Sequence, residues 1–303
     1  MKHLRGAALV TAMLVAALAA AVIATLAASQ SQWLRSVELR RDQVQAQALV
    51  LAGLTWARQV IREDALAGPL DHLGESWALP LPPTPLENGS IEGRIVDAQG
   101  LVNLNNLVAG GAIGRSEHRR AQRLFVEHGL PATALAALAD WIDEDDTPRE
   151  NGGESAEYAK RKPASLPPNA PLLRVAEATL ARDVDAARFA ALAGLVTALP
   201  IATPLNVNTA PPEVLAASID GLAGDALAKL AEERTKKPFS TVAEFRSRLP
   251  SGLTVDDPEA LAVRSDFFLV TVRARQGDTI AQGRALLHRR SNELPQVVWQ
   301  TLE

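Results

Sequence analysis

The chain has 303 residues and contains no cysteine. This absence excludes disulfides, thiolate zinc sites, iron–sulfur clusters and cysteine nucleophiles. Only five histidines are present, none beside another or four residues from another, which weighs against a histidine-rich metal site. Aromatic residues make up 4% of the chain although hydrophobic residues make up 47%, so alanine and leucine dominate the apolar content and favour helix.

A strong net charge is also missing. The chain has 31 Lys and Arg against 35 Asp and Glu, a formal net charge of −4. This balance argues against a protein whose main task is to neutralise nucleic-acid phosphate. The charges are unevenly placed, however: none lies between Gly6 and Leu34, whereas eight acids and one base lie between Asp140 and Glu157. These two segments are the strongest candidates for function.

The uncharged N-terminal segment is long enough to cross a membrane. Residues 7–28 contain only two polar side chains, and as a helix they would span about 33 Å against about 30 Å for a bilayer core. A cleaved signal peptide stays open as an alternative, although its apolar stretch would exceed the usual 7–15 or so residues. The basic residues on the two sides of the segment do not decide its orientation.

The apolar segment is expected to continue unbroken into an amphipathic helix. Residues 30–67 contain no proline. The expected apolar stripe recurs at helical spacing and consists of Trp33, Val37, Val44, Ala48 and Leu51. Gly68 and Pro69 are expected to end the helix, which would be about 60 residues long. A helix half in lipid and half packed on a domain is unusual for an enzyme.

Strand patterns stand at both ends of the body of the chain. Residues 69–90 are rich in proline and glycine and are expected to form a loop. Alternation over residues 91–97 predicts a half-buried strand, and residues 101–107 predict a second short one. Residues 267–275 and 280–288 predict a closing hairpin.

The chain between these strands is expected to be helical. The predicted helices cover residues 116–126, 132–142, 172–178, 184–199, 212–218, 225–234 and 242–248. Ser116 and Thr241 are expected to cap two of them, and Pro131 to open a third. Strands on both sides of a helical region predict one α+β domain interrupted by an all-helical domain.

Three features could suggest other chemistry but give no catalytic site. The glycine-rich run at residues 110–114 lacks the lysine of a P-loop and is interpreted as a linker. His118 and His128 are expected at the surface or at a helix end. No serine lies in a Gly-x-Ser-x-Gly turn.

The acidic segment at residues 140–154 is a candidate cation site. Carboxylates end a predicted helix, where the helix dipole favours cations, and they also repel one another. Oxygen ligands on a flexible loop suit Ca²⁺, which would remove both problems. Asp143, Asp145 and Glu154 match positions 1, 3 and 12 of an EF-hand loop, but Pro148 replaces its required glycine, so the loop is not an EF-hand. A solvated acidic turn stays open as the alternative.

Residues 206–245 resemble the helix-hairpin-helix modules of DNA-binding proteins. Such modules bind phosphate through the backbone amides of a Gly-x-Gly hairpin beside a basic helix. Here Ala223 replaces the second glycine, and Asp225 adds a negative charge. We interpret the segment as a structural or protein-binding module, with Asn206 and Thr209 as caps and turn formers.

The N-terminus resembles that of type IV pilin-like proteins, because a short basic leader ends at Gly6 and the apolar helix starts at Ala7. The resemblance implies that a prepilin peptidase cuts between Gly6 and Ala7. Most of these proteins have glutamate at mature position five, where it pairs with the N-terminal amine of the neighbouring subunit. Thr11 stands there in this chain. A subunit without this glutamate resembles the one at the filament tip, which has no subunit above it.

Motifs along the body resemble those of the K-type minor pseudopilins of bacterial type II secretion. They are Asp97-Ala98-Gln99-Gly100, Asp140-Trp141-Ile142-Asp143, Gly152-Gly153-Glu154 and Asn206-Val207-Asn208-Thr209-Ala210. The resemblance covers nearly the whole mature chain. It implies Ca²⁺ held by Asp143, Asp145 and Glu154, with Asp146 and Glu157 as further candidate ligands. Ser155 and Ala156 stand where family members usually have more acids.

The resemblance implies an α+β, type IV pilin-like fold, with a long N-terminal helix and a small antiparallel sheet, interrupted by a large all-α insert. The insert is expected to include a SAM- or helix-hairpin-helix-like part. The expected divisions are a leader at 1–6, a transmembrane helix at 7–29, the first part of the pilin-like domain at 30–108, the insert at 109–262 with its helix-hairpin-helix-like part at 204–250, and the C-terminal strands at 263–303.

The implied function is that of a minor pseudopilin, without catalysis. It would sit at the pseudopilus tip with I- and J-type minor pseudopilins, start pseudopilus assembly and support export of folded proteins from the periplasm. The major pseudopilin, the inner-membrane secretion platform and the prepilin peptidase are further implied partners. The chain would cross the inner membrane once, with its N-terminus cytoplasmic and its globular part periplasmic. A membrane-tethered DNA-binding or uptake protein, and a secreted calcium-dependent protein with a cleaved signal peptide, stay open as alternatives.

Overall fold

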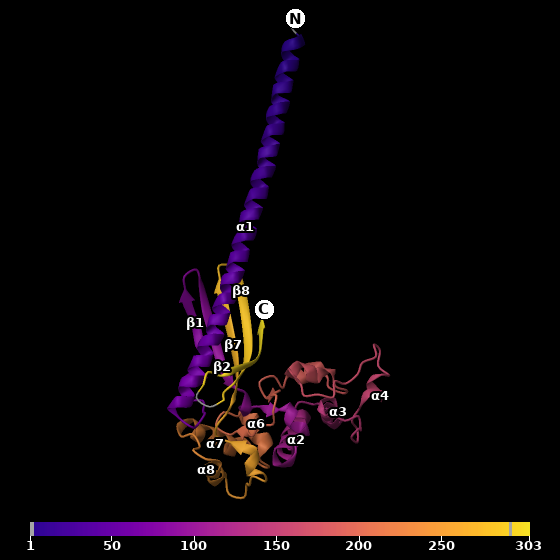
Figure 1. The fold of residues 1–303 in the computed structure, drawn as a ribbon, viewed down its shortest axis with the longest axis vertical. Coiled ribbons are helices and arrows are strands. Elements are labelled where there is room, and N and C mark those ends of the chain that lie inside the picture. The colour runs from indigo at the N-terminus through magenta and orange to yellow at the C-terminus, as the bar shows by residue number, and fades with distance from the viewer. Residues whose placement is uncertain (1–2, 291–292) are drawn as a thin grey trace.

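The protein is described by a computed structural model that covers residues 3–290 and 293–303, with side chains from residue 8 onward. A single helix, α1 (His3–Ala67), dominates its shape (Figure 1). Residues 8–41 are exposed on the part of α1 that projects from the globular body, and the rest of α1 packs on the sheet. The predicted continuous helix is confirmed, as is its end just before Gly68 and Pro69.

The buried stripe of α1 differs from the predicted one. Val44 and Leu51 are 65% and 43% exposed, whereas the buried hydrophobic residues are Ala46, Val50, Leu54, Ala57 and Ile61. Small residues on that face let the helix approach the sheet closely, since a Cβ at Gly53 would lie 2.8 Å from Val272 Cγ1. The prediction was wrong because apolar side chains lie on more than one face of α1, and the predicted stripe followed a face that is exposed.

The sheet has five antiparallel strands in the order β1-β2-β7-β8-β9. They are β1 (Leu81–Leu86), β2 (Gly89–Asp97), β7 (Phe267–Gln276), β8 (Thr279–His288) and β9 (Gln296–Leu302). The three central strands were predicted and are confirmed. The two edge strands were not, and β1 replaces part of the expected loop. Its prolines are compatible with a strand because β1 pairs on one side only.

The chain between β2 and β7 forms an insert at the end of the sheet away from the free part of α1 (Figure 1). Its α-helices are α2 (Gly111–Glu127), α3 (Ala132–Ile142), α4 (Ser155–Tyr158), α5 (Ala186–Ala190), α6 (Pro212–Ser218), α7 (Gly224–Lys236) and α8 (Val242–Ser247). Its 3-10 helices are η2 (Ala98–Gly100), η3 (Leu104–Val108), η4 (Val175–Leu180) and η5 (Pro258–Ala260), and η1 (Ser76–Ala78) precedes β1. Two parallel strand pairs, β3 (Val102–Asn103) with β4 (Val196–Thr197) and β5 (Leu205–Asn206) with β6 (Leu261–Ala262), show that the insert is not wholly helical.

Several predicted helices are confirmed, and others are wrong. Helices α3, α6, α7 and α8 lie where they were expected, whereas α2 begins before Ser116, which is buried inside it. The helix predicted over residues 184–199 shrinks to α5, because Val196 and Thr197 pair with β3. The strand predicted over residues 101–107 becomes β3 and η3, because Asn103 accepts a hydrogen bond from the Asn105 N–H and caps the 3-10 turn.

The described residues pack into two main cores. One lies entirely within the insert, and the other lies between α1 and the sheet. A small third cluster joins them and contains Ala98, Leu199, Phe267 and Leu286. The insert therefore carries its own core and meets the sheet at a narrow junction.

Candidate metal centre and membrane helix

Three carboxylates converge in the loop between α3 and α4. Asp140 comes from the last turn of α3, Asp143 is its C-cap, and Glu154 is the N-cap of α4. They are 0%, 9% and 3% exposed, and one oxygen from each lies within 4.8 Å of the other two. The structure thus brings Asp143 and Glu154 together, as the cation hypothesis requires, and adds Asp140. The i, i+3 spacing of Asp140 and Asp143 on a helix was the signal that could have revealed it.

Buried oxygens in this group have no protein partner. Asp143 Oδ1 and both Glu154 carboxylate oxygens are buried and accept no hydrogen bond within the described chain. Burial, together with the charges of Asp140 and Asp143, raises the pKa of Glu154 to about 7. Buried unpartnered carboxylates are costly, and a cation with oxygen preference would remove the cost. The donor set therefore fits Ca²⁺.

Arg149 is the cation that the structure places in this group. Its Nη1 donates to Asp140 Oδ1 over 2.7 Å and also contacts Asp143 Oδ2. The backbone N–H groups of Arg149 and Gly153 donate to Asp140 Oδ2 and fix that carboxylate. When all three are ionised, three carboxylates against one guanidinium leave an excess of two negative charges, which is the charge that a divalent cation would balance.

The other predicted ligands lie outside the group. Asp145 and Asp146 are exposed and accept hydrogen bonds from the backbone N–H groups of Thr147 and Ser155. Glu157 forms an ion pair with Lys160 at 3.1 Å. In this arrangement they shape the loop, and the charges of Asp145 and Asp146 also help to raise the pKa of Glu154.

Aromatic packing holds the loop against the insert core. Trp141 and Tyr158 form an edge-to-face pair with ring centroids 5.0 Å apart. The Tyr158 hydroxyl accepts a hydrogen bond from the Arg182 N–H, and Arg182 Nη2 donates to Asn151 O. Arg182, which is distant in sequence, thereby fixes the middle of the acidic loop and the helix that follows it.

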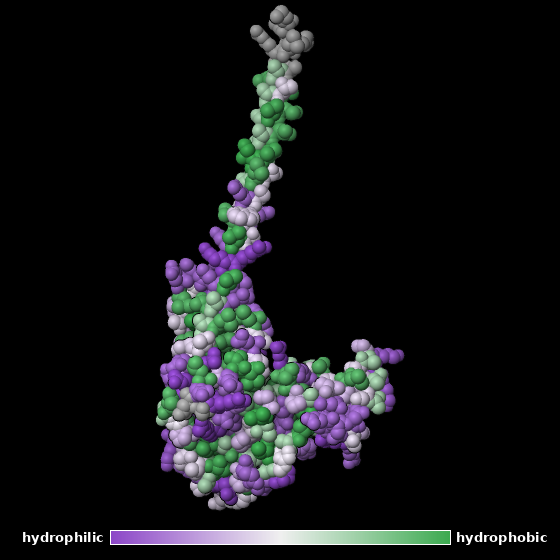
Figure 2. Space-filling model, in the orientation of Figure 1, coloured by the Kyte–Doolittle hydropathy of each residue, from purple (hydrophilic) through white to green (hydrophobic). Residues whose placement is uncertain are grey.

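The other candidate feature is the free part of α1. It contains a stretch long and apolar enough to cross a membrane. Figure 2 shows this apolar surface along the projecting helix and a hydrophilic band where α1 reaches the body. Gly6 and Ala7, the predicted processing residues, lie in the helical backbone, and only their backbone is described. Thr11 Oγ1 donates to Ala8 O within the helix.

The helix-hairpin-helix-like segment is held mainly by buried structural contacts. Arg234 is buried and donates to the carbonyl oxygens of Val207 and Ala210. Lys236 forms an ion pair with Glu232 at 2.6 Å, so acids offset its charge. These contacts favour the structural interpretation of the segment over binding of phosphate.

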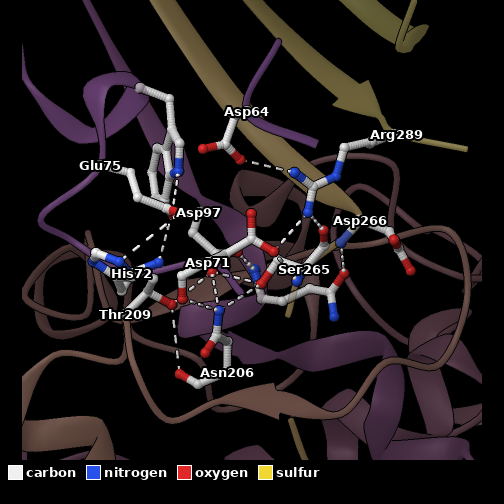
Figure 3. A network of polar contacts seen from close by, with 12 residues as sticks. Asp64, Asp71, His72, Glu75, Asp97, Asn206, Thr209, Ser265, Asp266 and Arg289 are labelled. Atoms are coloured by element: carbon white, nitrogen blue, oxygen red, sulfur yellow. Dashed lines mark hydrogen bonds and ion pairs between the residues drawn. The ribbon is translucent and has the colours of Figure 1, made fainter. Parts of the chain in front are cut away.

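Asn206 and Thr209 have a larger role than capping. Asn206 Oδ1 accepts from the Asn208 N–H, as expected of a turn former, but its amide group also donates to Asp97 Oδ2. Thr209 Oγ1 donates to the same carboxylate oxygen over 2.6 Å. This segment therefore joins the insert to the end of β2 (Figure 3).

Comparison with known proteins identifies the family. Models of the family described as type II secretion system (T2SS), protein K match residues 100–201 and 205–264. The chain is 32% identical to type II secretion system protein K of Pseudomonas aeruginosa over 285 residues, which cover 90% of this chain and 85% of the relative. It is 31% identical to the Klebsiella pneumoniae protein of the same name, with 94% and 92% covered.

A solved structure shows the same fold. A chain in the crystal structure of the GspK–GspI–GspJ complex from the enterotoxigenic Escherichia coli type 2 secretion system matches with a TM-score of 0.78 and 23% identity. The match covers 88% of this chain and 99% of that one. The fold is therefore shared over the matched part of this chain. By these sequence matches, the chain belongs to the protein K family of the type II secretion system.

Proposed function

We propose that this chain is the minor pseudopilin at the tip of the type II secretion pseudopilus, where it starts pseudopilus assembly and supports export of folded proteins. The main observation behind this proposal is that the insert lies at one end of the sheet and the free part of α1 projects from the other end (Figure 1). Subunits of a pilin-like filament add along their N-terminal helices. A bulky insert at the opposite end would obstruct a subunit above and leaves the chain suited to the tip.

The membrane helix supports the same role. The chain is a single-pass protein of the inner membrane, held by the apolar part of α1 before assembly. In the filament this apolar surface would be buried against other subunits. Thr11 provides no carboxylate for the N-terminal amine of another subunit, which a tip subunit does not need.

The partners that we propose are the other minor pseudopilins. The solved structure with the same fold contains GspI and GspJ beside GspK. By analogy, I- and J-type minor pseudopilins would form the tip complex with this chain, and the major pseudopilin would follow below. The secretion platform and the prepilin peptidase would act on it in the inner membrane. Its role is structural, and it has no catalytic step.

N-terminal sequencing of the chain from membranes tests the pilin-like role. We expect a mature start at Ala7, and a Gly6→Val variant should keep its leader and fail to restore secretion in a strain that lacks the chain. A start near Ala28 would instead support a secreted protein. Salt-dependent DNA binding by the purified chain would favour the uptake hypothesis.

We also infer that the acidic loop holds Ca²⁺ through Asp140, Asp143 and Glu154. The ion would supply the positive charge that Arg149 alone does not balance, and it would connect the end of α3 to the start of α4. Chelator should therefore lower the melting temperature of the full chain in detergent. In an Asp143→Ala variant the loop should no longer bind the ion, so chelator should lower the melting temperature by less than it does in the unchanged chain. Equal shifts in the two proteins would contradict the assignment.

A further inference from the structure

A second group of carboxylates lies where α1, the sheet and the insert meet (Figure 3). Asp64 is near the end of α1, and Asp71 and Glu75 follow in the segment that leads to η1. One oxygen from each lies within 4.8 Å of the other two. Asp64 and Asp71 are 8% and 0% exposed. The group is separate from the acidic loop between α3 and α4.

Donors on the protein anchor these carboxylates through one oxygen each. Asp71 Oδ2 accepts from the Ser265 N–H over 2.7 Å and from Arg289 Nη2 over 2.6 Å. Asp64 Oδ2 accepts from Arg289 Nη1 over 3.1 Å. Arg289 is itself buried and also donates to Ser265 O. The two carboxylates are therefore fixed in place rather than free to rotate away from each other.

Glu75 is anchored in the same manner. Its Oε2 accepts from the His72 N–H and from Trp77 Nε1, both over 2.8 Å. His72 Nε2 lies 3.9 Å from Oε1, beyond hydrogen-bond distance. Anchoring of ligands by neighbouring donors is what orients the side chains of a metal site.

An unpartnered oxygen gives an independent sign of a ligand. Asp71 Oδ1 is buried and has no hydrogen-bond partner within residues 3–290 and 293–303. A carboxylate oxygen that is fully removed from water and left unpaired is rare, and a bound ion is one of its established explanations.

The charge of the group favours a divalent cation. Arg289 forms ion pairs with Asp64 and Asp71, and Glu75 adds a third carboxylate, so with all three ionised the group has two negative charges in excess of this guanidinium. The acidic loop has the same composition, with Arg149 in place of Arg289. The C-terminal end of α1 adds to the negative potential, and its last turn contains no basic residue.

The carboxylate oxygens are close enough to bind one ion together. Ca²⁺ binds oxygens at about 2.3–2.6 Å, so two of its ligands lie up to about 5 Å apart, and the three oxygens fall inside that separation. Mg²⁺ usually keeps several bound waters, whereas Asp64 and Asp71 are buried, so the group favours Ca²⁺.

We propose that Asp64, Asp71 and Glu75 form a second calcium site, distinct from the acidic loop. It would fasten the end of α1 to the insert and to the closing strands. Asp71 already contacts both, because its N–H donates to Val263 O in the insert and its carboxylate accepts from Arg289 Nη2, directly after β8. The ion would stabilise the narrow junction at which the insert is attached.

Calcium binding to the full chain in detergent, measured by equilibrium dialysis, tests this site. A background variant with Asp143→Asn and Glu154→Gln removes the acidic loop as a binder. We expect this variant to retain about one Ca²⁺ per chain, since the described residues contain one other acidic group of this kind. Adding Glu75→Gln should weaken that binding at least about tenfold. Adding Glu92→Gln, a change at a half-buried residue of β2 that pairs with Arg273, should leave it unchanged.

Two results would overturn the proposal. One is a folded background variant that binds no Ca²⁺, and the other is undiminished binding after Glu75→Gln. If Glu75→Gln does not fold, the background variant decides alone, through the presence or absence of its bound Ca²⁺. Neither result bears on the tip role, which does not depend on this site.

Discussion

At the scale of single residues, close contacts decide which side chains are tolerated in the acidic loop. Gly152 lies directly against Asp140, and a Cβ at this position would overlap the Asp140 carboxylate. The backbone N–H of the next residue, Gly153, donates to the same carboxylate. A small residue at position 152 is therefore a condition for the arrangement of the three carboxylates.

Gly152→Ala should displace Asp140 and destabilise the chain by about 1–3 kcal/mol, because the overlap forces a backbone or side-chain shift. Gly110→Ala is the matched control, since a Cβ there meets nothing within 4 Å, and it should change stability by less than about 0.5 kcal/mol. Denaturant unfolding of both variants measures the difference. Equal stability of the two would contradict the packing described for the loop.

Asp97 gives a pH dependence at the same scale. Burial raises its pKa to about 6 from 3.8, although the Ser265 and Thr209 hydroxyls oppose the shift. An acid whose pKa is higher in the folded chain binds more protons there, so its contribution to stability falls as pH rises from about 4 to about 6 and is level above. Comparing unfolding free energies of the chain and Asp97→Asn across this range isolates the effect. A difference between the two that is independent of pH would contradict it.

At the scale of elements, sequence pattern predicted those that local chemistry determines. Helix α3 begins after Pro131, and the β7–β8 hairpin follows its alternating pattern. Strand β1 was missed because its prolines argue against a strand unless its position at an edge is known. The prediction of the buried stripe of α1 was wrong because apolar residues also lie on the exposed side of this helix, such as Val44 and Leu51, so spacing alone did not identify the face that packs on the sheet.

The candidate site was predictable to a similar degree. The acidic composition of the loop indicated a cation, and Asp143 and Glu154 do lie together. The sequence did not distinguish Asp145 and Asp146 from these two residues. In the structure their carboxylates instead accept hydrogen bonds from backbone N–H groups. The group around Asp71 could not be predicted, because its members meet only when distant elements pack.

Helix α8 allows a direct test of an element's end. Thr241 Oγ1 accepts a hydrogen bond from the Glu244 N–H and caps the helix, as its sequence predicted. Thr241→Ala should lower the free energy of unfolding by about 1 kcal/mol. Thr235→Ala, an exposed change inside α7, should change the free energy of unfolding by no more than about 0.3 kcal/mol. Thermal unfolding of the two variants makes the comparison, and a larger loss for Thr235→Ala would contradict the assigned cap.

At the scale of the whole molecule, three parts have separate tasks. The free part of α1 anchors the chain, the sheet packs on the rest of α1, and the insert covers the far end (Figure 1). The polar junction of Figure 3 holds the insert in place through Asp97, Asn206 and Arg289. The two unusual charge distributions of the chain therefore belong to different parts of the molecule. The uncharged segment lies in the free part of α1, and the acidic segment lies in the insert.

Co-purification of the full chain from detergent-solubilised membranes with the I- and J-type minor pseudopilins tests the tip role most directly. The account predicts that the three proteins elute as one complex and that this complex is required to start pseudopilus assembly. A variant that lacks the insert should leave the sheet and α1 but allow subunits to add above. Two results would contradict the account. One is that functional pseudopili assemble with the I- and J-type minor pseudopilins but without this chain. The other is that this chain elutes alone although both of those proteins are present.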